Sequence, residues 1–429
     1  MQTLSTKEIT AAEIIEKIRS KRSKSEDNEK LVRSILEDIK KGGDKEVMRY
    51  TKKFDSPHLE SLLVTEDEIE DAYSKTSKNL ISALKQAKEN IQSFHETHIQ
   101  KKEQVVETKK GVKIWREFRP IEKVGLYIPG GKAAYPSTVL MLAVPAKIAE
   151  CQEIIMCTPA DRDGKCNPAV LAAARICGVN KIYKVGGAQA IAAMAYGTES
   201  IPKVYKIFGP GNQFVTTAKI LLYGEVDIDM PAGPSEIGII ADETANSTFI
   251  AADFLSQLEH GEDSQSVLFT SSASLANAVE KEIQDSLKKL PRKEIINSSL
   301  KKSFAVICKN KEEICFLANE YAAEHLEIIA KEEDYFLKKI NNAGSIFLGE
   351  YTSEALGDYA TGANHTLPTS GFAKMFPPLS TESFGKMIQI QKVSREGFQS
   401  LCPIVETISD SEGLDAHKNS ALIRKKLST

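Results

Sequence analysis

Four of the seven histidines lie in the carboxyl-terminal part of the chain, each with acidic or amide residues close by. They are His260 in QLEHGEDSQ, His325 in YAAEHLEI, His365 in GDYATGANH and His417 in SEGLDAHK. Histidine changes protonation near neutral pH and often binds metals, so these segments favour proton transfer or metal binding. Because they are far apart in the sequence, one shared site would require the fold to bring them together.

The QLEHG segment ends a predicted helix. Residues 250–260 have helical apolar spacing, and Gly261 should end the helix, which leaves Gln257 and His260 in its last turn. Side chains three residues apart can face one ligand. Glutamine is an uncommon zinc ligand, so the spacing alone favours a hydrogen-bonded pair at a helix end over a metal site.

Two further segments carry acid and histidine together. Residues 312–328 are predicted to form a helix that ends near Glu324 and His325. Adjacent residues do not share a helix face, but at a helix end both can border a cavity. A Glu/His couple suits water activation and alcohol deprotonation. The alternative is a surface glutamate beside a capping histidine.

Asp358 and His365 lie in a glycine-rich segment that is predicted to be a loop. A carboxylate beside imidazoles and an amide would suit Zn²⁺. Glu412 and His417 complete the series, but five positions separate them, so a shared helix face is uncertain. The sequence has no HExxH motif and no cysteine-rich zinc signature, so spacing alone cannot show that these residues converge.

Three glycine clusters each follow a predicted strand: Gly130-Gly131, Gly186-Gly187 and Gly209-Pro210-Gly211-Asn212. Glycine allows close backbone approach, and the amino terminus of a following helix favours phosphate. None of the clusters matches GxGxxG. Taken singly each indicates a tight turn, but three at successive strand ends make a nucleotide-like ligand equally plausible.

The elements that must position these residues follow from the apolar pattern. Helical spacing dominates up to about residue 105, and residues 105–118 predict a hairpin around Gly111. Strands and helices then alternate, which predicts parallel sheets that bind ligands beyond the carboxyl ends of their strands. The predicted fold class is α/β, with two Rossmann-like parallel-sheet domains, an N-terminal helical region and a C-terminal helical arm. The predicted bounds are 1–105, 106–235, 236–380 and 381–429.

Composition excludes several other classes. A chain of 429 residues is too long for one ordinary core, and a net charge of −3 argues against a nucleic-acid surface. We find no run of 18 apolar residues and no secretory h-region, so neither a membrane span nor a signal peptide is predicted. The seven cysteines form no CxxC pair, which favours buried, reduced thiols and a cytoplasmic location.

Eight segments together resemble histidinol dehydrogenase, in the order that this family shows. They are VGLYIPGG, VGGAQAIAAMAYGT, FGPGN, PAGPSE, QLEHG, YAAEHL, GDYATGANHTLPT and EGLDAHK. The resemblance extends over about residues 30–425. It implies the last step of histidine biosynthesis, a two-step NAD-dependent oxidation of L-histidinol to L-histidine through a bound aldehyde. It also implies one Zn²⁺ per subunit and a homodimer whose carboxyl-terminal arm enters the partner's site.

The resemblance assigns roles to residues at matching positions. The implied zinc ligands, which would also contact the substrate, are Gln257, His260, Asp358 and His417. The implied acid/base pair is Glu324 and His325, and His325 would also contact the substrate. The other implied substrate contacts are Ser235, His365 and Glu412. The implied NAD contacts are Tyr127, Gln189 and Asn212.

One position departs from the family pattern: Ala323 stands where the family usually has proline before the Glu-His pair. Proline would restrict the backbone there, so we expect an effect on rate at most. Three other functions remain as alternatives. They are oxidation of a different primary alcohol, metal-dependent hydrolysis without NAD, and ligand binding without catalysis.

Overall fold

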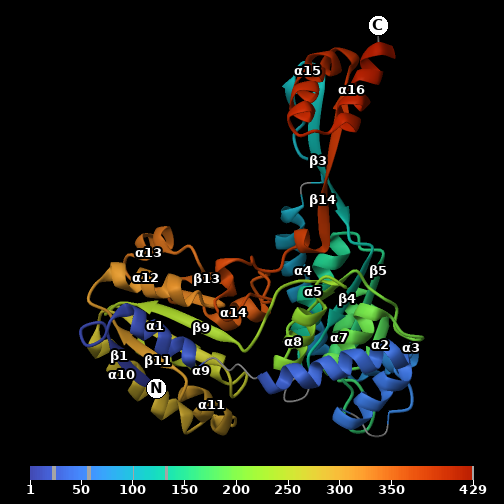
Figure 1. Ribbon diagram of the computed structural model, residues 1–429. Coiled ribbons are helices and arrows are strands. Elements are labelled where there is room, and N and C mark those ends of the chain that lie inside the picture. Colours follow the sequence, from blue (N-terminus) through green and yellow to red (C-terminus); the bar gives the residue numbers. More distant parts are fainter. Residues whose placement is uncertain (22–25, 56–58, 100, 131–133, 428–429) are drawn as a thin grey trace. The chain divides into compact units, whose positions relative to one another are not determined.

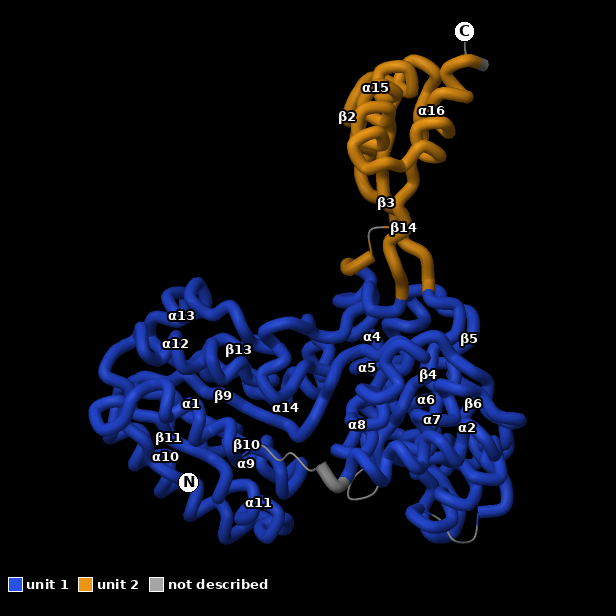
Figure 2. The backbone as a smooth tube through the Cα atoms, viewed as in Figure 1, with its two compact units in different colours: residues 1–96, 121–384 blue, residues 97–120, 385–429 orange. Residues whose placement is uncertain are grey.

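The computed structural model describes residues 1–21, 26–55, 59–99, 101–130 and 134–427, so His58 and Gly131 lie outside the described residues. The chain divides into two units (Figure 2). Unit 1 comprises residues 1–96 and 121–384, and unit 2 comprises residues 97–120 and 385–429. Among the described residues, no helix has the length and apolar character to cross a membrane. All seven cysteines are buried free thiols, as predicted.

Unit 1 contains a five-stranded sheet in which all pairs are parallel (Figure 1). Its strand order is β6-β5-β4-β7-β8. The strands in that order are Lys181–Lys184, Glu153–Thr158, Lys123–Tyr127, Lys206–Phe208 and Asp227–Ile228. The intervening helices are α5 (Pro136–Ile148), α6 (Pro168–Cys177), α7 (Gly187–Tyr196) and α8 (Gln213–Leu222).

Helices from the amino-terminal region pack on this sheet's own helices. α2 (Glu26–Phe54) packs against α7 and α8, and it is kinked at Gly43, which has a φ of +52°. The helical pattern of this region is therefore interrupted at Gly43. α3 (Glu66–Lys75) packs against α6, and α4 (Lys78–His95) packs against α5. Apolar residues of α2, α7 and the strands share one buried core, which holds the carboxyl ends of the strands in place.

A second, six-stranded sheet of unit 1 is also parallel throughout. Its order is β1-β11-β10-β9-β12-β13. The strands in that order are Gln2–Ser5, Phe304–Ile307, Gln265–Thr270, Glu236–Ala241, His325–Ile329 and Ser345–Leu348. Ile239 and Ile240 enter different core clusters, because successive side chains of a strand point to opposite faces. The predicted α/β class with two parallel sheets is confirmed.

Helices cover both faces of this sheet. α9 (Ser247–Leu258), α10 (Ala273–Leu287) and α11 (Lys293–Leu300) share one core cluster. α1 (Ala11–Ser20), α12 (Lys311–Tyr321) and α13 (Glu333–Lys339) share the other. β1 was not predicted: it pairs with β11, about 300 residues away in the sequence, so no local pattern marks it as a strand.

Unit 2 combines the predicted hairpin with the end of the chain. β2 (Val106–Lys109) and β3 (Val112–Pro120) form the hairpin, and Gly111 has the positive φ of +80° that its turn needs. β14 (Gly385–Val393) pairs antiparallel with β3 and is followed by α15 (Arg395–Ser411) and α16 (Asp415–Leu427). The tail is thus helical as predicted, but it begins with a strand that the sequence analysis missed.

Candidate active site

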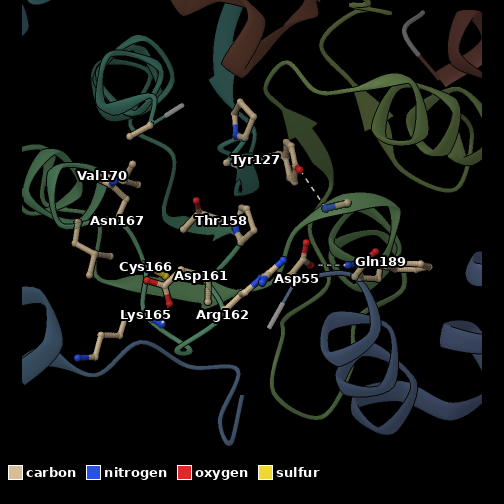
Figure 3. A pocket seen from close by; sticks show the side chains of 18 of the residues that line it. Asp55, Tyr127, Thr158, Asp161, Arg162, Lys165, Cys166, Asn167, Val170 and Gln189 are labelled. Carbon is tan, nitrogen blue, oxygen red and sulfur yellow. Dashed lines mark hydrogen bonds between the residues drawn. The ribbon is translucent and has the colours of Figure 1, made fainter. Parts of the chain in front are cut away.

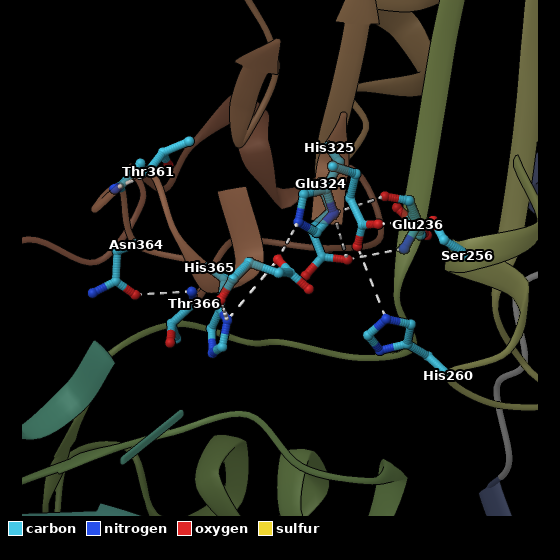
Figure 4. Close-up of polar contacts among 12 residues, drawn as sticks. Glu236, Ser256, His260, Glu324, His325, Thr361, Asn364, His365 and Thr366 are labelled. Carbon is cyan, nitrogen blue, oxygen red and sulfur yellow. Dashed lines mark hydrogen bonds and ion pairs between the residues drawn. The ribbon is translucent and has the colours of Figure 1, made fainter. Parts of the chain in front are cut away.

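Acidic and histidine side chains gather at the amino-terminal ends of the strands in the six-stranded sheet (Figure 4). Glu236 begins β9 and His325 begins β12. Gln257 lies in the last turn of α9, but the helix ends at Leu258, so the prediction that His260 also lies in its last turn is wrong. Glu324 directly precedes β12, and the rest come from the helix α14 (Glu354–Tyr359) and the loop after it. The cluster consists of Glu236, Gln257, His260, Glu324, His325, Glu354, Asp358 and His365.

His325 lies between two carboxylates. Its Nδ1 lies 3.6 Å from Glu324 Oε2, and its Nε2 lies 3.4 Å from Asp358 Oδ1. Burial opposes charge on the ring, but Glu324 and Asp358 together outweigh burial and raise the pKa of His325 well above its usual value. Glu324 Oε2 also accepts a hydrogen bond from the Glu236 backbone N–H at 2.9 Å. The fold thus places the His325 imidazole between the carboxylates of Glu324 and Asp358 in one buried site.

The predicted helix over residues 312–328 is wrong at its carboxyl-terminal end. α12 stops at Tyr321, because Ala322 adopts a left-handed conformation with a φ of +50°. Glu324 precedes β12, and His325 is the first residue of that strand. The pair therefore comes from a helix-to-strand connection, where adjacent side chains are not constrained to opposite helix faces.

Asp358 lies on a short helix, α14, and not in the loop that the glycine pattern predicted. His365 does lie in a loop, and its Nδ1 donates to the Asp358 carbonyl oxygen at 3.0 Å. That bond leaves His365 Nε2 to accept from Thr138 Oγ1 at 3.2 Å. The histidines around Asp358, with His325 first, hold the pKa of its carboxyl well below the usual range despite burial.

Three of these side chains are close enough together to hold one metal ion. A ring nitrogen of His260 and carboxylate oxygens of Glu354 and Asp358 all lie within 4.8 Å of one another. Gln257 is fully buried beside them. With its amide nitrogen toward Glu354, Gln257 donates to Oε1 across 3.1 Å and accepts from the Glu236 N–H across 3.2 Å.

This donor set fits a divalent cation. In the described part of the chain, Asp358 Oδ1 is a buried carboxylate oxygen without a hydrogen-bond partner. Imidazole nitrogen with carboxylate and amide oxygen suits zinc or a similar borderline ion. Burial lowers the pKa of His260 and so favours the neutral ring that binds metal. Burial and the nearby Asp358 raise the pKa of Glu354 to about 8, a strain that a bound cation would relieve.

Glu354 was not predicted from the sequence, because it lies outside the histidine-bearing segments. Its signal was available: Glu354 and Asp358 are four residues apart in EALGD, so they share one face of a helical turn. Ser256 Oγ donates to Glu354 Oε2 at 2.9 Å, which fixes the carboxylate beside Gln257.

Of the remaining predicted residues, Ser235 adjoins the cluster in the chain, whereas Glu412 and His417 belong to unit 2. Ser235 directly precedes β9 and is half-buried, and its carbonyl accepts from the Gln265 N–H at 3.1 Å. Glu412 caps the carboxyl end of α15, and His417 lies in the first turn of α16. Both are exposed residues of unit 2, so they are not among the residues that unit 1 brings together.

A cavity of about 1230 Å³ lies at the carboxyl ends of the strands in the five-stranded sheet (Figure 3). The predicted NAD contacts Tyr127, Gln189 and Asn212 all line it, as does Gly130. Its size exceeds the range of about 300–1,000 Å³ that is usual for small-ligand pockets, which leaves room for a dinucleotide.

The cavity combines helix amino termini with polar and cationic side chains. The Gly187 N–H donates to Tyr127 Oη at 3.1 Å, and Asn212 Oδ1 caps α8 through the Phe214 and Val215 N–H groups. Arg162 and Lys165 supply positive charge to the lining. Helix amino termini and cations together suit a phosphate-bearing ligand.

Four acidic residues also line this cavity (Asp55, Glu68, Asp71 and Asp161), and Asp55 is the one bonded to a predicted NAD contact. Gln189 Nε2 donates to Asp55 Oδ2 at 3.0 Å. Burial raises the pKa of Asp55 to about 6, although hydrogen bonds from Gly186 and Gln189 partly oppose that rise. Asp55 was not identified from the sequence, because it lies in the amino-terminal helical region, far from any glycine cluster.

Comparison with known proteins gives one consistent result. The family model for histidinol dehydrogenase matches residues 18–425. The chain is 51% identical over 394 residues to a histidinol dehydrogenase of Bacteroides fragilis, covering 92% of each chain. It is 46% identical over 421 residues to that of Methanocaldococcus jannaschii, covering 98% of this chain and 97% of the relative.

A solved structure agrees over the whole fold. The histidinol dehydrogenase of Elizabethkingia anophelis has a TM-score of 0.95 and 44% identity, covering 100% of this chain and 99% of that one. The acid–histidine cluster, the dinucleotide-sized cavity and these matches lead to one conclusion: the chain belongs to the histidinol dehydrogenase family.

Proposed function

We propose that this protein oxidises L-histidinol to L-histidine in two NAD-dependent steps through a bound aldehyde, the last step of histidine biosynthesis. The observation that carries the proposal is the buried Glu324–His325–Asp358 cluster, in which one carboxylate lies 3.6 Å from Nδ1 and the other 3.4 Å from Nε2 of the His325 ring. The names of the relatives support the substrate. A cytoplasmic location belongs to the same proposal.

The metal would be one Zn²⁺ per subunit, held by Gln257, His260 and Asp358 of one chain and by His417 of unit 2. When bound, zinc would supply orientation, because it can hold the amine and imidazole nitrogens of the substrate. Glu354, whose carboxylate lies within 4.8 Å of the donor atoms of His260 and Asp358, would orient this set by accepting a hydrogen bond from the Gln257 amide nitrogen. Ser235, His365 and Glu412 would contact the substrate.

His325 would receive the hydroxyl proton of the alcohol at Nε2. This atom is buried and has no hydrogen-bond partner within the described residues, whereas Nδ1 lies 3.4 Å from the Glu236 carbonyl oxygen. Asp358, 3.4 Å from Nε2, would stabilise the imidazolium that results. NAD⁺ supplies the hydride acceptor for each of the two oxidation steps.

Glu324 would activate the water that attacks the aldehyde. Its Oε2 already accepts the Glu236 N–H, so Oε1 is the oxygen left to take a proton from water. His325 would assist the second oxidation. Because the cluster is buried, the reactive amino aldehyde would be kept from bulk water between the steps.

The dinucleotide would occupy the cavity of the five-stranded sheet and contact Tyr127, Gln189 and Asn212. Arg162 and Lys165 would offset phosphate charge there. We also propose the four domains bounded at residues 105, 235 and 380, and a homodimer in which the carboxyl-terminal arm reaches the partner's site. His417 would then act in trans.

The deciding experiment follows NADH formation with L-histidinol and NAD⁺, before and after removal of metal by a chelator. We expect two NADH per histidine, loss of activity on chelation, and recovery with Zn²⁺. Absence of NADH from the zinc-loaded protein would refute the proposal. NADH with another primary alcohol but not histidinol would instead favour a relative with a different substrate, and turnover of an ester or amide without NAD would favour a hydrolase.

A second experiment tests the shared site. Subunits with His417→Ala and subunits with His260→Ala would each be inactive, because each lacks one proposed zinc ligand. Mixed dimers should regain part of the activity if His417 acts across the dimer, since some sites would then be intact. If mixed dimers form but show no activity, the carboxyl-terminal arm does not contribute His417 to the partner's site.

A further inference from the structure

Lys219 and Asp229 form a buried ion pair behind the Gly209–Asn212 loop. Their side chains are 2% and 1% exposed. Lys219 comes from α8, and Asp229 follows β8. The Lys219 Nζ contacts Asp229 Oδ1, and Asp229 Oδ1 also accepts from the Met230 N–H at 2.6 Å. Charges buried to this degree are tolerated only when they are paired and hydrogen-bonded. The other hydrogen bonds of the pair therefore indicate which part of the structure it positions.

The further bonds go to both backbone polar groups of Gly209. The Gly209 N–H donates to Asp229 Oδ2 at 2.7 Å, and Lys219 Nζ donates to the Gly209 carbonyl oxygen at 2.9 Å. Gly209 has a φ of +125°, and a Cβ there would lie 2.1 Å from the Tyr127 carbonyl oxygen. The ion pair therefore clamps one glycine in a conformation that other residues rarely adopt, tight against the end of β4.

The clamped glycine lies between two residues of the cavity. Tyr127 is the residue whose backbone it touches, and Asn212 lies three positions later and caps the helix that carries Lys219. The Tyr127 hydroxyl in turn accepts from the Gly187 N–H at the start of α7. A shift of Gly209 would thus reach both cavity residues.

We propose that Lys219 and Asp229 are positioning residues for the dinucleotide: through Gly209 they set the place of Tyr127 and Asn212 in the cavity. This inference rests on the proposed NAD-dependent function. A general contribution to stability does not account for the pair, because an apolar pair of similar volume stabilises a core about as well. Unlike an apolar pair, the two charged side chains hydrogen-bond both the N–H and the carbonyl oxygen of Gly209.

The test is the double variant Lys219→Met/Asp229→Asn, which leaves no unpaired buried charge. We expect the KM for NAD⁺ to rise about tenfold, which is the size expected when hydrogen bonds that position a site are lost. The KM for histidinol and the zinc content should stay within about twofold, because the metal cluster lies at the other sheet. Lys206→Met is the control: Lys206 of β7 forms an ion pair with Asp227 of β8, near Asp229 in the chain, and the hydrogen bonds to Gly209 come from Lys219 and Asp229 instead.

Each outcome bears on one claim. If the unaltered protein forms no NADH from histidinol, the proposed function fails. If it is active and the double variant keeps its KM for NAD⁺ within twofold, the positioning role is wrong. If both KM values rise together with a fall in thermal stability, the pair is merely structural and the inference is also overturned. Should the double variant not fold, Asp229→Asn alone must show the same selective rise in smaller size, and an unchanged KM for NAD⁺ there overturns the inference.

Discussion

The two parallel sheets of unit 1 share a strand order but place their functional residues at opposite edges. Leaving β1 aside, both arrange their strands, numbered along the chain, as third, second, first, fourth and fifth. In the five-stranded sheet, the cavity residues Tyr127 and Asn212 lie at or just beyond carboxyl ends of strands. In the six-stranded sheet, Glu236 and His325 begin their strands, so the acid–histidine cluster lies at the amino ends.

The difference follows the sign of charge that each edge offers. A helix that follows a parallel strand begins at the carboxyl edge of the sheet and ends at the amino edge. Helix amino termini carry partial positive charge and favour phosphate, which fits the cavity beside α7 and α8. Helix carboxyl termini favour cations, and α9 and α12 end at the acid–histidine cluster. One strand order therefore presents partial positive charge at the carboxyl ends of its strands and partial negative charge at their amino ends.

The strongest test of this separation removes chemistry from one edge alone. Glu324→Gln should lower turnover by about 10²- to 10⁴-fold, the range typical for loss of a general base. Aldehyde oxidation should suffer more than alcohol oxidation in single-turnover measurements, because the water step needs Glu324. Binding of NAD⁺ should not change, and Glu312→Gln, an exposed glutamate on α12, serves as control. Equal loss in both half-reactions would contradict the assigned role.

The next largest effect concerns the cation at the same edge. Glu354→Gln should weaken zinc binding by about 10- to 100-fold, because it removes the carboxylate that fixes Gln257 and approaches His260 Nε2 at 3.9 Å. Competition with a chelating dye measures this directly. Ser256→Ala removes one hydrogen bond to Glu354 and should weaken binding less. An unchanged zinc affinity in Glu354→Gln would exclude Glu354 from the metal site.

The sequence predicted the cavity at the carboxyl ends of the five-stranded sheet better than the acid–histidine cluster at the amino ends of the six-stranded sheet. Alternating strands and helices predicted both sheets, and glycines at strand ends marked the place of the cavity, because close backbone approach needs glycine. The amino edge has no such general signal. Its residues come from the end of α9, from α14 and from the segment before β12, and their convergence exists only in the tertiary fold.

Errors at individual elements have the same origin. α12 ends at Ala322 through a left-handed conformation at an alanine, which no sequence rule marks as a helix stop. β14 pairs with β3 across more than 260 residues of chain, so its strand character depends on a distant partner. The roles of Glu412 and His417 were predicted from family resemblance alone. Both are exposed residues of unit 2, so the described structure of one chain does not place them in the cluster.

A smaller effect is expected at the carboxyl edge of the five-stranded sheet. Gln189→Ala should raise the KM for NAD⁺ about tenfold, since it removes a polar contact from the cavity and leaves Asp55 without its amide partner. The KM for histidinol and the zinc affinity should not change if the two edges work separately. Steady-state kinetics with each substrate varied in turn measures both constants. A parallel rise of the two KM values would break the proposed separation.

The last prediction, Asp55→Asn, concerns folding stability and tests the electrostatic environment at the carboxyl ends of the five-stranded sheet. Burial raises the pKa of Asp55 from 3.8 to about 6, so the folded state binds this proton more tightly than the unfolded state does. Stability from this group is therefore present below about pH 4 and is lost as the pH rises through about 6. The loss amounts to at most about 3 kcal/mol at neutral pH.

Asparagine cannot ionise, and its oxygen can still accept the hydrogen bonds that Asp55 accepts from Gln189 and Gly186. Asp55→Asn should thus be more stable than the unaltered protein at pH 7.5 and should lose that advantage by about pH 4.5. Urea unfolding at the two pH values measures the difference, with the exposed Asp163→Asn as control. If the variant is instead less stable at pH 7.5, the ionised Asp55 carboxylate is stabilised in the folded protein. The cavity would then be more favourable to negative charge than the burial of Asp55 indicates.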